Sequence, residues 1–113
     1  MTLILYFAKH RNMNLVFKAL SDPTRRHILQ LLRKRAMNAG EIAEHFSISK
    51  PTLSAHFAVL READLIAPHK QGTTITYRLK LSVLEDALLA FAQTVGVGVP
   101  AAPKLRKATG KST

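Results

Sequence analysis

The sequence contains no cysteine among its 113 residues. Disulfides, thiolate metal sites and cysteine nucleophiles are therefore excluded, although this absence does not by itself identify the compartment. The chain also lacks a run of about 18 apolar residues, the length that a membrane-spanning helix needs. Its apolar start, MTLILYFAKH, has no preceding basic segment and no small-residue cleavage site, so we do not expect a secretory signal.

Acidic residues are scarce. Seven Asp and Glu stand against seventeen Lys and Arg, which gives a formal net charge of +10. Such a surface attracts polyanions, nucleic acid first and an anionic membrane second. The few carboxylates, together with the lack of a glycine-rich phosphate loop or a nucleophile elbow, argue against an enzyme. The length fits one domain with a single core.

Apolar spacing predicts a helix over residues 21–35, SDPTRRHILQLLRKR. Ser21 or Asp22 can cap its start, and Pro23 fits the first helical position, where no N–H is needed. A short first helix is predicted before it from the spacing of four apolar residues: Leu15, Val16, Ala19 and Leu20.

A third helix is predicted over AGEIAEHF, residues 39–46, with Asn38 as its cap and Glu41 as the capping-box partner. Ser47-Ile48 then forms a tight connection to a fourth helix at 50–63. Two helices joined by a short turn are typical of a helix-turn-helix. The buried face of the fourth helix is predicted from residues spaced i, i+4 and i+7: Leu53, Phe57 and Leu60.

The segment that follows changes to a period of two. Leu65-Ile66 begins a strand, KQG makes the turn, and apolar positions then alternate with polar ones in the second strand, TITYRL. Helical spacing returns over residues 81–95. We therefore predict a mainly α fold with a small β-hairpin, arranged as a winged helix-turn-helix.

Three segments carry a resemblance to a known family: FKALSDPTRRHILQLL, GEIAEHFSISKPTLSAHFAVLREADLI and KQGTTITYRL. Over about residues 14–92 they resemble the ArsR family of prokaryotic winged-helix transcriptional repressors, and most closely its metal-independent autorepressor (SdpR-like) branch. The resemblance implies a homodimer that binds a partly palindromic operator in double-stranded DNA. We also expect a cytoplasmic location and no membrane partner.

The resemblance also suggests boundaries. Residues 1–12 form an N-terminal extension, which is either a native segment or an artefact if Met13 is the initiator. The DNA-binding domain is expected at 13–95. Residues 96–113 are rich in Gly, Pro, Ala and Lys without any acid, and we expect a flexible basic tail that is either solvated or attracted to phosphate.

The fourth helix, at 50–63, is the second helix of the helix-turn-helix. A helix in this position enters the major groove with its first turn facing the base edges. Capping is the expected main role of Ser49, and packing or phosphate bonding that of His56. The resemblance supports four base-reading positions: Lys50, Pro51, Ser54 and Ala55. The complete predicted DNA-binding set of the fourth helix and the wing is Ser49, Lys50, Pro51, Thr52, Ser54, Ala55, His56, His69, Lys70, Gln71 and Thr73.

Two further predictions concern structure. Arg25 and Arg26 are expected either to pair with Glu41 or Glu44 or to contact phosphates, with a structural role for at least one of them. The first and last helices are expected to form the isologous seam of a dimer, although burial within one chain is the alternative. The residues expected in that seam are Leu15, Val16, Leu20, Leu81, Leu84, Leu88, Phe91 and Val95.

Metal sensing is the main alternative within the family. The segment EIAEHF offers no thiolate, and the last helix offers Glu85 and Asp86 without a histidine, so we expect no metal and no cofactor. Any effector is unknown. The leading hypothesis is a dimeric repressor or autorepressor, against a metal- or ligand-responsive sensor and a winged-helix protein-interaction module without specific DNA binding.

Overall fold

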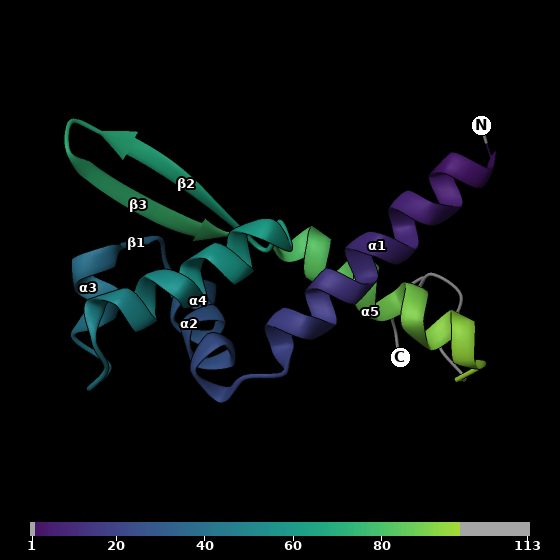
Figure 1. Ribbon diagram of the computed structural model, residues 1–113, viewed down its shortest axis with the longest axis horizontal. Coiled ribbons are helices and arrows are strands. Elements are labelled where there is room, and N and C mark those ends of the chain that lie inside the picture. The colour runs from purple at the N-terminus through teal and green to yellow at the C-terminus, as the bar shows by residue number, and fades with distance from the viewer. Residues whose placement is uncertain (1, 98–113) are drawn as a thin grey trace, which may run out of the picture.

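The computed structural model describes residues 2–97, and their side chains from residue 11 onward. Its elements are α1 (Thr2–Leu20), α2 (Pro23–Lys34), β1 (Met37–Asn38), α3 (Ala39–Ala43), α4 (Lys50–Glu62), β2 (Ile66–Gln71), β3 (Thr74–Leu79) and α5 (Leu81–Val95) (Figure 1). The predicted winged helix-turn-helix is confirmed. Most of the expected tail, residues 98–113, lies outside the described residues.

Helix α1 is longer than the short first helix that the sequence predicts. It runs unbroken for 19 residues, and the boundary that we expected between residues 12 and 13 lies inside it. No glycine or proline interrupts the segment from residue 2 to residue 20, so nothing in it stops a helix from continuing. Near its end, Val16 and Ala19 are fully buried.

Helix α2 begins at Pro23, and of the two expected caps Asp22 is the one used. Its carboxylate accepts from the backbone N–H of Thr24 at 2.8 Å and of Arg25 at 3.2 Å. These bonds satisfy two of the N–H groups that a helix start leaves without partners. The helix buries Ile28, Leu29 and Leu32, its contribution to the core.

The sheet has three antiparallel strands in the order β1-β3-β2, where the sequence predicted a hairpin alone. Strand β1 pairs Met37 with Tyr77, but its two residues are too few to show a period of two. The hairpin turn is Gly72-Thr73, which overlaps the predicted turn KQG only at Gly72. Gly72 has φ of 61°, a conformation that glycine adopts without steric cost.

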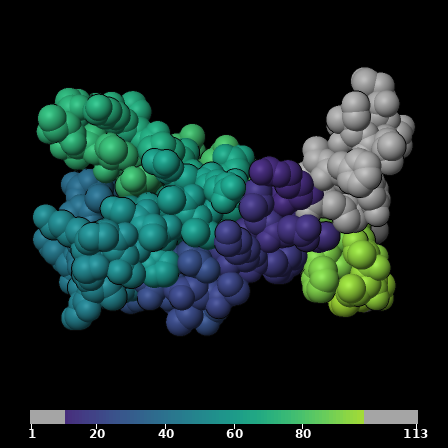
Figure 2. Space-filling model, viewed as in Figure 1, coloured from purple at the N-terminus to yellow at the C-terminus, as the bar shows by residue number. Residues whose placement is uncertain are grey.

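The core lies where α1, α2, α3 and α4 meet the base of the hairpin. Its largest fully buried side chains are Ile28, Ile42, Leu60, Leu65 and Val16. The hairpin extends beyond this core and stands out from the helices as a separate ridge (Figure 2). Between residues 2 and 97, none of the helices has the length and hydropathy needed to cross a membrane.

Candidate nucleic-acid interface

The helix-turn-helix consists of α3, the turn at 44–49 and α4. Asn38 caps α3 as predicted: its side chain accepts from the Glu41 N–H at 2.8 Å, and the Glu41 carboxylate accepts from the Asn38 N–H at 2.9 Å. The α-helix ends at Ala43 rather than at residue 46. Bonds from His45 N to Ile42 O and from Phe46 N to Ala43 O tighten the last turn into i→i+3 geometry.

Helix α4 begins with the cap that the sequence predicts. Ser49 Oγ accepts from the Thr52 N–H at 3.2 Å and donates to Thr52 Oγ1 at 2.9 Å. Pro51 lies in the first turn, where its missing N–H costs no helical bond. The first turn is therefore fixed by its own side chains, and the N-terminal end of the helix is open to solvent.

The two faces of α4 differ as predicted. Leu53, Phe57 and Leu60 are buried. The opposite face is exposed and consists of small, polar or basic side chains: Lys50, Pro51, Thr52, Ser54 and Ala55. Phe57 stacks on Tyr77 of β3, with ring centroids 4.8 Å apart and planes at 27°. This contact joins α4, the second helix of the helix-turn-helix, directly to the wing.

His56 is held from outside α4. Its side chain is only 16% exposed, Arg25 Nη1 donates to its Nδ1 at 3.2 Å, and Asp22 Oδ2 lies 3.9 Å from the same nitrogen. Two residues at the N-terminal end of α2 therefore contact the middle of α4 through His56. This arrangement favours the packed role that we expected for His56 over base reading.

Arg25 and Arg26 do not pair with Glu41 or Glu44, but both have the structural role that we expected for at least one of them. Arg25 donates to the carbonyls of Ala19 at 2.8 Å and Lys18 at 3.0 Å, and Arg26 donates to that of Leu20 at 2.7 Å. The last four carbonyls of a helix have no intrahelical partners, and both arginines follow closely enough to reach those of α1. Glu41 pairs instead with Arg35 at 3.2 Å.

Two carboxylates at helix starts are held in the ionised form. Partial desolvation works against this at Asp22, but the Arg25 N–H, the nearby His56 and the Thr24 N–H outweigh it and lower the pKa. The Asn38 N–H and the bond from Arg35 lower the pKa of Glu41. Both groups therefore contribute to helix capping as anions.

Four of the residues predicted to contact DNA lie at the tip of the wing. His69 pairs with Thr76 and Lys70 with Ile75 near the end of the hairpin. The predicted residues His69, Lys70, Gln71 and Thr73 are all exposed. The tip lies away from α1 and α5, on the side of the molecule that also carries α3 and α4 (Figure 1).

The predicted dimer residues differ in burial and form three groups. Val16 is fully buried in the core of its own chain, so we remove it from the seam; the periodicity that marks a buried face cannot tell which partner covers it. Leu15, Leu20, Leu81 and Leu84 are partly buried. Leu88, Phe91 and Val95 are 45%, 45% and 53% exposed. Phe91 meets Phe17 of α1 edge to face, with centroids 5.0 Å apart.

Histidines and carboxylates do not converge on a metal site in the part of the chain that the structure describes, where no group of three or more such ligands occurs. His27 and His45 approach each other, with ring centroids 6.4 Å apart. His27 also packs edge to face on Phe46 at 4.8 Å. This cluster is aromatic packing between α2 and the turn that follows α3.

Comparisons with known proteins agree with this geometry. The sequence profile of bacterial regulatory proteins of the arsR family matches residues 22–67. The transcriptional repressor SdpR of Bacillus subtilis (strain 168) is 54% identical over 76 residues, which span 67% of this chain and 84% of SdpR.

Solved structures give the same result. An ArsR-like transcriptional regulator from Rhodococcus sp. RHA1 superposes with a TM-score of 0.69 at 27% identity, covering 79% of this chain and 83% of that one. A homodimeric winged helix-turn-helix DNA-binding domain from Mycobacterium bovis superposes with a TM-score of 0.64 at 28% identity, covering 80% and 83%. The chain therefore belongs to the ArsR family of bacterial regulatory proteins.

Proposed function

We propose that the protein is a homodimeric transcriptional repressor that binds a palindromic operator through α4 and the wing tip. The observation that carries the proposal is the division of α4 into two faces. Leu53, Phe57 and Leu60 hold the helix against the core, and the exposed front offers only short or flexible side chains. Such a front allows the close approach to base edges that reading in the major groove requires.

The individual side chains of α4 suit this role. Lys50 can donate to guanine acceptors or to phosphate, and Ser54 can donate or accept at a base edge. Ala55 can contact a thymine methyl. Ser49, Thr52 and the N-terminal end of the helix favour a phosphate nearby, because the first N–H groups carry partial positive charge.

The wing supports the same reading. Lys70 and its exposed neighbours at the tip can contact the backbone or enter the adjacent minor groove. The formal net charge of +10 adds long-range attraction to DNA. The stack of Phe57 on Tyr77 fixes the hairpin relative to α4, so both can approach one duplex in a constant orientation.

An exposed apolar stripe on α5 supports the dimer. Leu88, Phe91 and Val95 lie at i, i+3 and i+7 on one side of the helix, and each is about half exposed. A contiguous apolar surface of this kind is typical of an interaction site. The stripe lies at the opposite end of the molecule from the wing (Figure 1), so pairing there leaves both α4 helices free. The homodimeric Mycobacterium bovis relative supports the same assembly.

Fluorescence anisotropy on the protein's own upstream region tests the proposal. We expect saturable binding to that DNA and an affinity for a scrambled duplex that is weaker by about 10³-fold or more. The affinity should fall steeply between 50 and 200 mM salt, since each neutralised phosphate releases counterions. Equal, weak binding to both duplexes would contradict sequence-specific repression and favour a protein-interaction module.

A further inference from the structure

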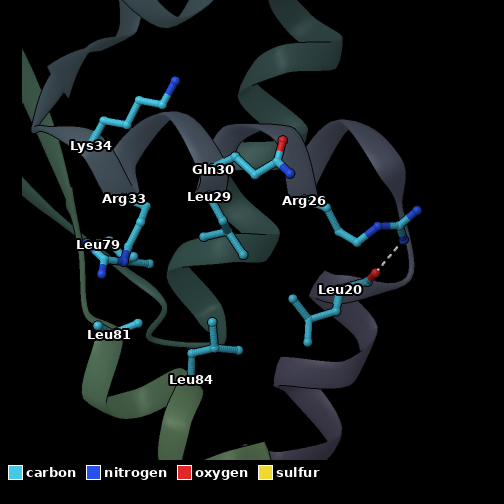
Figure 3. A pocket seen from close by; sticks show the side chains of 9 residues that line it. All are labelled: Leu20, Arg26, Leu29, Gln30, Arg33, Lys34, Leu79, Leu81 and Leu84. Carbon is cyan, nitrogen blue, oxygen red and sulfur yellow. Dashed lines mark hydrogen bonds between the residues drawn. The ribbon is translucent and has the colours of Figure 1, made fainter.

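A hollow of about 720 Å³ opens beside α2, away from the exposed front of α4. Five leucines form its apolar lining: Leu20, Leu29, Leu79, Leu81 and Leu84. Figure 3 shows that Leu20, Leu29 and Leu84 point toward one another from α1, α2 and α5. Its volume lies within the range of about 300–1,000 Å³ that is usual for small-molecule sites.

The rim of this hollow is cationic. Arg26, Arg33 and Lys34 belong to its lining, and no Asp or Glu does. The guanidinium of Arg26 is anchored to the Leu20 carbonyl at 2.7 Å, as the dashed line in Figure 3 marks. Arg33 and Lys34 are exposed, and neither forms an ion pair with any side chain that the structure describes.

The positive charges of the rim and the apolar lining together indicate which kind of molecule can bind in the hollow. Cations on the last turn of α2 are favourable beside its C-terminal carbonyls, but that interaction does not explain the leucine-lined space next to them. The charged side chains of residues 98–113 are all basic, so the rim would repel this segment. A nucleic-acid backbone has no apolar body to bury. A small molecule with an apolar body and an anionic head complements both parts.

We propose that this hollow is a binding site for a small apolar carboxylate, with its hydrocarbon body among the leucines and its carboxylate at Arg33, whose side chain lies beside Leu79 in Figure 3. Arginine is suited to this contact because its planar fork can donate two parallel bonds to one carboxylate. The site includes Leu20, Leu81 and Leu84, three residues that the sequence also predicts in the dimer seam. The exposed stripe of Leu88, Phe91 and Val95 lies farther along α5, so a dimer formed through that stripe alone leaves the hollow open. The proposal does not depend on DNA binding.

Isothermal titration calorimetry on the full chain tests the proposal with three probes of equal chain length, all below their micellar concentrations. Decanoate should bind once per chain. Decanamide, without charge, and decyltrimethylammonium, with the opposite charge, should bind at least about tenfold more weakly. Equal binding of all three probes, or no saturable binding of decanoate, would overturn the proposal. The latter is also the result expected if a second copy of the chain fills the hollow.

Variants locate the site. Arg33→Gln should weaken decanoate binding by about fivefold or more, whereas Arg61→Gln, which removes an exposed cation of α4 outside the hollow, should leave it within about twofold. Leu84→Phe should weaken decanoate binding, because the larger ring narrows the leucine-lined space. If that variant fails to fold, the comparison of Arg33→Gln with Arg61→Gln still decides. Equal losses in those two variants would show that decanoate binds by general charge attraction, and the proposal would be wrong.

Discussion

Arg25 Nη1 lies 3.2 Å from His56 Nδ1, and this contact joins the start of α2 to the middle of the recognition helix. The same guanidinium holds the Ala19 and Lys18 carbonyls at the end of α1. One side chain therefore connects the helix that packs against α5 with the helix proposed to read DNA. Arg25 is a positioning residue in this arrangement, and His56 is its point of contact on α4.

Replacing Arg25 with lysine should destabilise the fold. Lysine keeps the charge but lacks the planar fork that serves three acceptors at once, so we expect a loss of roughly 1–2 kcal/mol in the free energy of unfolding. Urea unfolding followed by circular dichroism measures it. Arg61→Lys, at an exposed position of α4, is the matched control. Equal stability of the two variants would mean that the Arg25 contacts contribute nothing.

Replacing Ser49 with alanine should weaken the start of α4. The Thr52 N–H would lose its 3.2 Å acceptor, and loss of an N-cap costs about 0.5–2 kcal/mol. Ser49→Asp should retain most of the stability, because aspartate caps equally well. It should nevertheless weaken DNA binding, since a negative charge would then face the phosphates. Wild-type stability of Ser49→Ala in thermal unfolding would show that the cap is dispensable.

Replacing Lys50 with alanine should reduce operator affinity by about tenfold, near the lower end of what one specific base contact provides. Affinity for scrambled DNA should change less. Arg61→Ala is the control, because it removes one cation from the other end of the same helix. If Lys50→Ala loses the same affinity for operator and for scrambled DNA, then Lys50 contacts only phosphate and reads no base.

Replacing Phe91 with aspartate should prevent dimerisation. A charge in the centre of the α5 stripe would have to be buried without a partner, and such burial costs several kcal/mol. Light scattering should then give the monomer mass for Phe91→Asp. The same charge at exposed Gln93 on the same helix should leave the dimer intact. A monomeric wild-type protein, or a dimeric Phe91→Asp, would contradict the proposed seam.

Stability should fall as the solution is acidified. Asp22 and Glu41 have folded-state pKa values below their ordinary values of 3.8 and 4.5, so the unfolded chain binds protons first as the pH decreases. Their contribution is complete above the ordinary pKa values and is lost as the pH falls through the lowered ones. Glu41→Gln should flatten the dependence of the urea midpoint on pH between 5 and 3. Glu62→Gln, outside the capping box, is the matched control; an equal effect in both variants would contradict this role for Glu41.

Local signals in the sequence predicted most of the fold. The Asn38–Glu41 capping box, the Ser49 cap and the spacing of Leu53, Phe57 and Leu60 are each encoded within one turn or a few turns of chain. Strand β1 escaped prediction because two residues show no period, and its pairing with Tyr77 spans forty positions. The full length of α1 was not predicted, because only its last turns carry the apolar spacing that marks a buried face.

The contacts around the candidate site were also hard to predict, because they join residues that are far apart in the sequence. Arg25 and His56 are 31 residues apart, and no local pattern relates the start of α2 to the middle of α4. The identity of the exposed α4 residues followed from the buried ones, since a helix that buries one face must present the other. The burial of Val16 within its own chain could not be separated from burial in a dimer, because both give the same apolar spacing.

The most direct test of the proposed function is selection of binding sites by the purified full chain from a library of random duplexes. Two α4 helices related by the symmetry of a dimer should enrich an inverted repeat with half-site centres about 10–10.5 base pairs apart. Lys50→Ala should lose or alter the preference within each half-site while keeping the spacing. Recovery of no common sequence, or of single half-sites without symmetry, would contradict a dimeric repressor that reads its operator through α4.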